Sequence, residues 1–149
     1  METTQSQDQL QQTTALSEEK NHLFDWLRSL EEDTDLQFIF DLTSHFEHHS
    51  EELLKGIQND IEQKDYKAIA FKAHKLKSAA GNLGSTSAWK HCQQIEEYCQ
   101  SEQIEQIVKI FPDLSQECAQ TFLSCKEYIF LKEQQTKGIL SSTNKSELL

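Results

Sequence analysis

The sequence has 149 residues, a size that fits one domain, and its 25 acidic residues against 14 Lys and Arg give a formal net charge of −11. This acidic balance argues against nucleic acid and anionic membrane surfaces as partners, because binding to phosphates requires a basic surface. Four glycines and one proline leave few turn positions, so the composition predicts an all-α protein. No apolar run approaches the roughly 20 residues that cross a bilayer and no signal peptide is apparent, which together predict a cytoplasmic protein.

The N-terminal part of the chain predicts a flexible arm followed by two helices. Residues 1–16 are rich in Gln, Thr and Ser and too polar to form much core, so we expect them to be flexible. Ser17 is suited to cap a short first helix. Thr34, with Gln37 three residues later, forms a capping-box pattern that predicts a long second helix to about Gln63. Helical spacing places on its inner face the apolar residues Phe38, Leu42, Phe46, Leu53, Ile57 and Ile61.

Three further helices are predicted downstream. Asp65 is the expected cap of a helix that ends near Gly84, because glycine readily adopts the left-handed backbone of a helix C-terminus. The next helix follows directly and ends near Gln100. The pair Phe111–Pro112 predicts a turn before a last helix over residues 113–132.

These elements predict a four-helix bundle with an additional N-terminal helix. The helical domain is expected to span residues 17–133, after the flexible arm of residues 1–16. Residues 134–149 contain a Lys-Gly pair and a Ser-Ser-Thr-Asn run, which predict a flexible C-terminal tail.

His74 is the strongest candidate for a functional residue. On a helical wheel of about 100° per residue, Lys77, Ser78 and Gly81 lie on the same side as His74, while the apolar residues point well away from it. An exposed imidazole with an ordinary pKa of about 6.5 is largely neutral and nucleophilic near pH 7. Lys77 can reach phosphate oxygens, and the small Ser78 and Gly81 leave room for another protein. The alternative is that His74 is one solvated residue on a lysine-rich helix.

The segment around His74 is also a basic island in an acidic chain. Between residues 64 and 91 there are six lysines and the single acid Asp65. Such an island can stabilise a transferred phosphoryl group or receive an acidic partner surface, although Lys64, Lys72 and Lys90 are expected only to solvate the outside of a helix. The six are Lys64, Lys67, Lys72, Lys75, Lys77 and Lys90.

The string Ala73–Gly84, AHKLKSAAGNLG, resembles the signature of histidine-containing phosphotransfer (HPt) domains, and the similarity covers roughly residues 34–131. One departure is Ser78, where many members have glycine, but serine is also small. The resemblance implies that His74 is the phosphoacceptor and that Lys77 stabilises the charge of the phosphoryl group. It implies a free-standing phosphorelay intermediate that carries a phosphoryl group between receiver-domain aspartates in two-component signal transduction.

The resemblance also implies the partners, which are response-regulator receiver domains, a hybrid sensor kinase, or both. We expect a monomer that docks through an apolar patch beside the histidine, which includes Phe71, Ala70 and exposed residues of the first two helices. Ser78, Gly81 and Gly84 are expected to form the small-residue face and the helix end. No nucleotide-binding motif is present, so no ATP-binding or kinase activity of its own is expected. The chain is expected to need no cofactor, because the Mg²⁺ belongs to the partner receiver.

Two other functions are compatible with the same sequence. The bundle could bind a receiver as an interaction module without being phosphorylated. It could also be the phosphoacceptor domain of a split sensor kinase, which would receive phosphate directly from an ATP-binding partner.

The remaining candidates for chemistry are cysteines and histidines outside the motif. Cys92, Cys99, Cys118 and Cys125 form two pairs seven residues apart, which is typical of helical core positions and not of C-x-x-C sites. We expect reduced, buried thiols, with a disulfide or a four-thiolate metal site as the alternatives. His45 and His49 share a helix face near Glu52 and offer a divalent-metal site, but a solvated or partly packed cluster is the expectation, and no metal is assigned.

Overall fold

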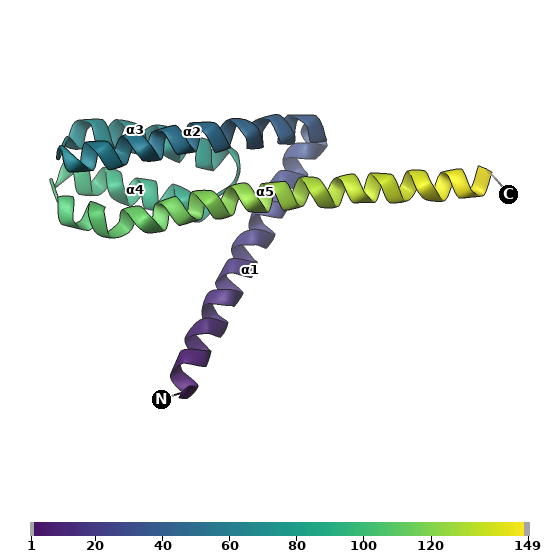
Figure 1. Ribbon diagram of the computed structural model, residues 1–149, viewed down its shortest axis with the longest axis horizontal. Helices are drawn as coiled ribbons and strands as arrows, with labels where there is room; N and C mark the ends of the chain where they lie inside the picture. Colours follow the sequence, from purple (N-terminus) through teal and green to yellow (C-terminus); the bar gives the residue numbers. More distant parts are fainter. Residues whose placement is uncertain (1, 148–149) are drawn as a thin grey trace.

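A computed structural model shows an all-α protein with five helices in the part of the chain that it describes (Figure 1). It describes the backbone of residues 2–147 and the side chains of residues 8–138 other than 12, 13 and 16. The helices are α1 (Glu2–Asp33), α2 (Leu36–Glu62), α3 (Tyr66–Asn82), α4 (Thr86–Gln100) and α5 (Ile104–Glu147). Helices α2 to α5 lie side by side as a four-helix bundle that α1 precedes, which confirms the predicted fold. None of the described helices is both long and apolar enough to span a membrane.

The bundle closes around one apolar core to which all five helices contribute. Leu23 and Leu27 are buried, so the C-terminal part of α1 packs into the bundle. The buried face of α2 begins at Ile39, whereas Phe38, which was predicted to face inward, is 43% exposed. The prediction was wrong there because the buried face includes polar Thr43 and Ser50, which apolar spacing alone does not select. The largest buried side chains are Phe46, Leu27, Ile39, Ile57, Ile69, Leu76, Leu83, Ile95, Ile107 and Leu114.

The helix ends beside the histidine segment follow local hydrogen bonding. Asp65 caps α3, as predicted, because its carboxylate accepts a hydrogen bond from the Ala68 backbone N–H at 3.1 Å. The cap of α2 is Asp35, whose carboxylate accepts from the backbone N–H of Phe38 at 2.8 Å. The predicted cap, Thr34, is wrong because its hydroxyl donates backward to the Leu30 carbonyl at 2.7 Å instead.

Helix α5 corrects the predicted turn at Phe111–Pro112. The chain turns earlier, around Glu102, whose φ of 52° is left-handed, and α5 then runs through Pro112 without ending. Proline removes one backbone hydrogen bond from a helix interior, but buried Ile107 and Leu114 lie on either side of it on the core face. The packing of these side chains therefore keeps the segment helical.

Both ends of the chain continue as helices beyond the predicted domain of residues 17–133. Helix α1 begins at Glu2, although a start near Ser17 was predicted, because residues 2–16 contain no Gly or Pro that would end a helix. Figure 1 shows the N-terminal part of α1 and the C-terminal part of α5 projecting from the bundle in different directions. The flexibility of residues 1–16 and 134–149 stays a prediction.

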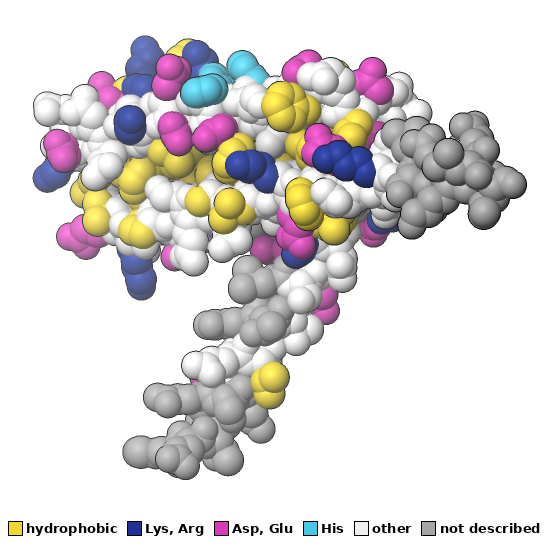
Figure 2. Space-filling view, turned by 45° about the vertical axis from the view of Figure 1, so that its right-hand side comes forward, with side chains coloured by type: hydrophobic (Ala, Val, Ile, Leu, Met, Phe, Trp, Pro, Cys, Tyr) yellow, Lys and Arg dark blue, Asp and Glu magenta, His cyan; other side chains and the backbone are white. Residues whose placement is uncertain are grey.

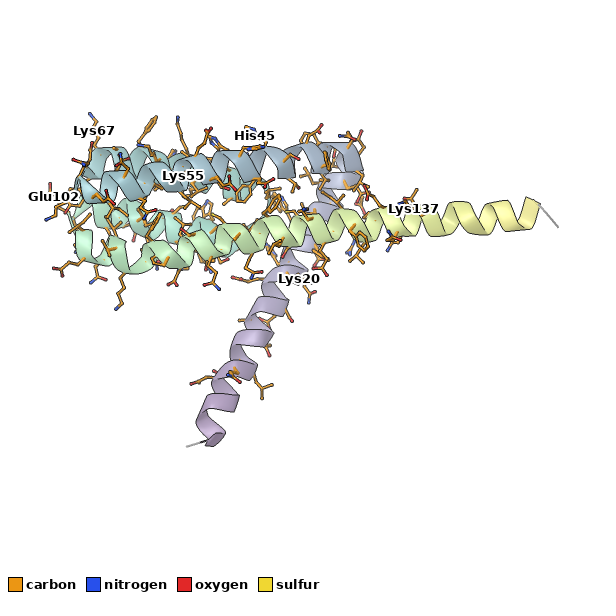
Figure 3. All side chains as sticks on the ribbon, viewed as in Figure 1. Lys20, His45, Lys55, Lys67, Glu102 and Lys137 are labelled. Atoms are coloured by element: carbon orange, nitrogen blue, oxygen red, sulfur yellow. The ribbon has the colours of Figure 1, made fainter. Side chains whose placement is uncertain are left out.

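Helix α1 is fastened to α5 where the two cross. The Lys20 ammonium lies 2.5 Å from the Glu127 carboxylate, and Figure 3 shows Lys20 at this crossing. The Tyr128 hydroxyl donates to the Glu31 carboxylate, and the Tyr128 ring packs edge-on against Phe24 with 5.5 Å between centroids. These contacts hold the C-terminal part of α1 against the bundle, and so position Trp26 at the end of α3.

Candidate functional site

The imidazole of His74 points out of the bundle from the middle of α3. Its side chain is 66% exposed, whereas Ala73 and Leu76 on either side of it are fully buried. This confirms the orientation predicted from the helical wheel. The histidine is therefore within reach of another macromolecule, while α3 remains anchored in the core.

The second helix of the site is α4, which brings Glu96 to His74. One carboxylate oxygen of Glu96, Oε1, lies 3.3 Å from His74 Nδ1. The same carboxylate receives Lys77, whose Nζ lies 3.1 Å from Oε1 and 3.2 Å from Oε2. Glu96 thus joins the two residues that the sequence had placed one turn apart on α3.

Glu96 was not predicted as part of the site, because its carboxylate lies 22 residues from His74 on a different helix. One signal was present in the spacing of Trp89, Gln93 and Glu96, which recur at i, i+4 and i+7 and therefore share a face of α4. Only the packing of α4 against α3 shows that this face meets Lys77.

The contact with Glu96 determines which nitrogen of His74 is available. A carboxylate accepts hydrogen bonds, so the neutral imidazole carries its proton on Nδ1, facing Glu96 Oε1. The lone pair then resides on Nε2, for which no hydrogen bond is found within the described residues. In the neutral imidazole, the arrangement therefore leaves Nε2 free as a nitrogen nucleophile beside the lysine ammonium.

The small residues predicted near His74 differ in their surroundings and in whether the backbone requires them. Ser78 is exposed, and its hydroxyl donates to the His74 carbonyl at 3.3 Å, so it adds little bulk beside the imidazole. At Gly81, a Cβ atom would lie 3.5 Å from Cδ1 of Trp89, which is ordinary van der Waals contact. The helix backbone therefore does not require glycine at position 81.

Gly84, by contrast, is required by the backbone and by its neighbour. Its φ is +75°, a left-handed conformation, as predicted for the end of this helix. A Cβ atom there would lie 2.5 Å from Cγ of Trp26. The Trp26 indole also donates to the Asn82 carbonyl at 3.1 Å, so α1 packs tightly over the end of α3. Gly84 thus serves the helix end and makes no contact with His74.

The lysines of the basic island separate into distinct environments. Lys72 pairs with the Asp60 carboxylate of α2, so it contributes to the α2–α3 contact. Lys75 places its ammonium 4.4 Å from the ring centroid of exposed Phe71. Lys67 lies at the outer edge of the bundle (Figure 3). Lys77 is the lysine of this island that faces Glu96.

The four cysteines are buried and free, as predicted. Burial raises the pKa of Cys99 to about 11 and those of Cys118 and Cys125 to about 12, and it also raises the pKa of the Cys92 thiol. Thiols with such raised pKa values carry almost no thiolate near neutral pH and are poor nucleophiles. The cysteines therefore belong to the core and offer no second reactive centre.

The other histidines lie away from His74. The rings of His45 and His49 stack with 5.3 Å between centroids on the outer side of α2, where Figure 3 shows His45. Within the described residues, no group of three or more His, Cys, Asp or Glu is arranged to hold a metal ion. His91 lies between α4 and α5, where its Nδ1 is 2.6 Å from Glu117 Oε2. Burial raises the pKa of the Glu117 carboxyl, and His91 opposes this effect.

Comparison with known proteins agrees with this geometry. The family model of the Hpt domain matches residues 41–122, more than half of the chain, so the chain belongs to the Hpt domain family. Among solved structures it resembles histidine-containing phosphotransfer protein B of Pseudomonas aeruginosa, with a TM-score of 0.65 and 22% identity over 70% of this chain and 90% of that one. It also resembles a histidine-containing phosphotransfer protein of Medicago truncatula, with a TM-score of 0.66 and 23% identity over 85% and 92% of the two chains. No curated protein sequence is significantly similar to this chain.

Proposed function

We propose that this protein is a phosphorelay intermediate in two-component signalling, which carries a phosphoryl group on His74 between receiver-domain aspartates. The observation that supports this most directly is the exposed His74 imidazole, whose Nδ1 is turned to Glu96 and whose Nε2 is left open. The position of His74 within the Hpt match of residues 41–122 agrees with this role.

In the proposed reaction, the Nε2 lone pair of His74 attacks the phosphorus of a receiver aspartyl phosphate in line with the departing oxygen. An N–P bond forms, the P–O bond to the aspartate breaks, and the aspartate leaves as a carboxylate. The imidazole keeps its proton on Nδ1, where the Glu96 carboxylate stabilises the positive charge that develops on the ring. Transfer to a second receiver is the reverse of this step.

Lys77 supplies positive charge to the phosphoryl oxygens. It lies one turn after His74, a spacing that places side chains about 5–6 Å apart at Cβ on the same helix face. The receiver contributes the aspartate and its bound Mg²⁺. Glu96 is a positioning residue, because it holds the tautomer of His74 and the ammonium of Lys77 with the same carboxylate.

The proposed partners are receiver domains of response regulators or of hybrid sensor kinases, and we propose that the protein acts as a monomer. Docking would use the exposed surface around His74, where Phe71 is 62% exposed and Ser78 leaves open space. Figure 2 shows hydrophobic side chains exposed among charged ones on one face of the bundle.

The test is phosphorylation of the purified protein by a panel of receiver domains that have been charged with acetyl phosphate. Wild type should acquire acid-labile, base-stable phosphate, and His74→Gln should acquire none while its melting temperature is unchanged. His48→Gln is the matched control, because His48 is an exposed histidine on α2, and this variant should be labelled like wild type.

Other outcomes would point to other functions. Label that persists on His74→Gln would refute the assignment of the phosphoacceptor. Binding of a receiver with no label on wild type would favour an interaction module. Label from an ATP-dependent kinase core that lacks any receiver would favour the split-kinase function.

A further inference from the structure

The Lys77 side chain is unusually confined for a surface lysine. It is 16% exposed, although lysine side chains normally extend into water. Its contacts on α4 come from three residues on one face of that helix. These are Glu96, Gln93, whose Oε1 accepts a hydrogen bond from Nζ at 3.4 Å, and Trp89, whose ring centroid lies 5.6 Å from Nζ.

The three α4 contacts differ in how they affect the charge of Lys77. Glu96 neutralises the ammonium, and a phosphoryl group on His74 would compete with Glu96 for it. Trp89 and Gln93 carry no net charge, so they hold the ammonium without reducing its attraction for a phosphoryl group. Their contacts can persist whichever anion Lys77 pairs with.

Trp89 is itself well placed to act as a fixed surface. The indole is 40% exposed, and its inner edge faces the backbone of Gly81, where a Cβ atom would be 3.5 Å from Cδ1. Ala88, the preceding residue, is fully buried and anchors this turn of α4. The ring is therefore supported from α3 and α4 and leaves one side to Lys77.

We infer that Trp89 is a positioning residue for phosphotransfer, which keeps the Lys77 ammonium beside His74 while the pairing of that ammonium changes between Glu96 and the phosphoryl group. This inference rests on the proposed function for the step that it serves. It predicts that the indole acts on the transfer step and not on docking, since its contact is with Lys77.

The first measurement needs no phosphorylation. In wild type, the ring current of Trp89 should shift the ε-methylene protons of Lys77 upfield in NMR spectra. The shift should disappear in Trp89→Leu, which keeps an apolar side chain but removes the aromatic face. Trp89→Phe should retain part of it. An unchanged Lys77 shift in Trp89→Leu would overturn the inference.

The second measurement is transfer from a receiver that labels wild type. A cation–π contact at a partly exposed site is worth about 0.5–1 kcal/mol, so kcat should fall about two- to fivefold in Trp89→Leu, with KM unchanged and with partial rescue in Trp89→Phe. Phe122→Leu is the control: it removes a similar contact on α5, where Lys126 Nζ lies 5.4 Å from the Phe122 centroid, and should leave kcat unchanged.

The outcomes separate this inference from the proposed function. A raised KM with unchanged kcat in Trp89→Leu would overturn the inference, because Trp89 would then act in docking. Equal loss of kcat in Trp89→Leu and Phe122→Leu would also overturn it, as a general effect of reduced stability. No label on wild type would refute the proposed function itself, and with it the step that Trp89 is inferred to serve.

Discussion

The middle of α3 and its C-terminal end are built in opposite ways. Around His74 the helix surface is open, and the functional side chains are held by polar contacts with Glu96 on the neighbouring helix. Ten and eleven residues later, at Gly84 and Ser85, the chain is locked by the left-handed backbone of Gly84, by the indole of Trp26 and by a buried hydrogen bond between the Ser85 and Thr121 hydroxyls at 2.7 Å.

This contrast shows how one helix serves two requirements. In the proposed function His74 meets successive partners, which requires groups whose contacts can be exchanged. The helix that carries the site must nevertheless stay in place. Its end is therefore fixed by steric constraints and by burial, which do not depend on the partner.

The largest effect is expected at the locked end. Gly84→Ala should lower the free energy of unfolding by about 3 kcal/mol, because it combines a left-handed alanine with a clash against Trp26. Urea denaturation would measure this loss. In a Trp26→Leu background the same substitution should cost clearly less, because part of the clash is removed. If Gly84→Ala lowers the free energy of unfolding by less than about 1 kcal/mol in the protein that retains Trp26, the proposed lock is contradicted.

A smaller effect, on activity and not on folding, is expected in the open middle. Lys77→Ala should slow phosphoryl transfer to His74 about tenfold, the equivalent of about 1.4 kcal/mol, because the phosphoryl oxygens lose their nearby cation. The matched control is Lys75→Ala, which removes an exposed lysine of the same helix that contacts Phe71 and not Glu96. A transfer rate in Lys77→Ala equal to that of wild type, measured with one phosphorylated receiver, would remove Lys77 from the site.

The smallest effect, a change in the free energy of unfolding, is expected at Gly81, which lies between the two regions of α3. Gly81→Ala should raise the free energy of unfolding by about 0.5–1 kcal/mol, because alanine favours the helix and its Cβ fits against Trp89. If Gly81 provides clearance for a partner, the same variant should bind the receiver more weakly, which titration calorimetry would detect. Tighter or unchanged binding would show that the glycine is not there for docking.

Much of the fold could be predicted from local signals. Asp65 and Gly84 mark the ends of α3 through a side-chain cap and a left-handed residue, and both predictions are confirmed because these effects act within a few residues. The prediction of a turn at Pro112 was wrong because packing against distant segments outweighs the local effect of the proline. The helix persists there because Ile107 and Leu114 pack into a core formed by distant segments.

In the candidate site, too, some features follow from a single helix and others depend on contacts between helices. The outward orientation of His74 and its place beside Lys77 follow from the 3.6-residue repeat of a single helix, so the sequence was sufficient for both. The partnership of Glu96 with these two residues, the confinement of Lys77 by Trp89 and the approach of Trp26 to Gly84 join different helices. Only the tertiary structure decided them, because the rotation and register of packed helices depend on how side chains from the whole core fit together.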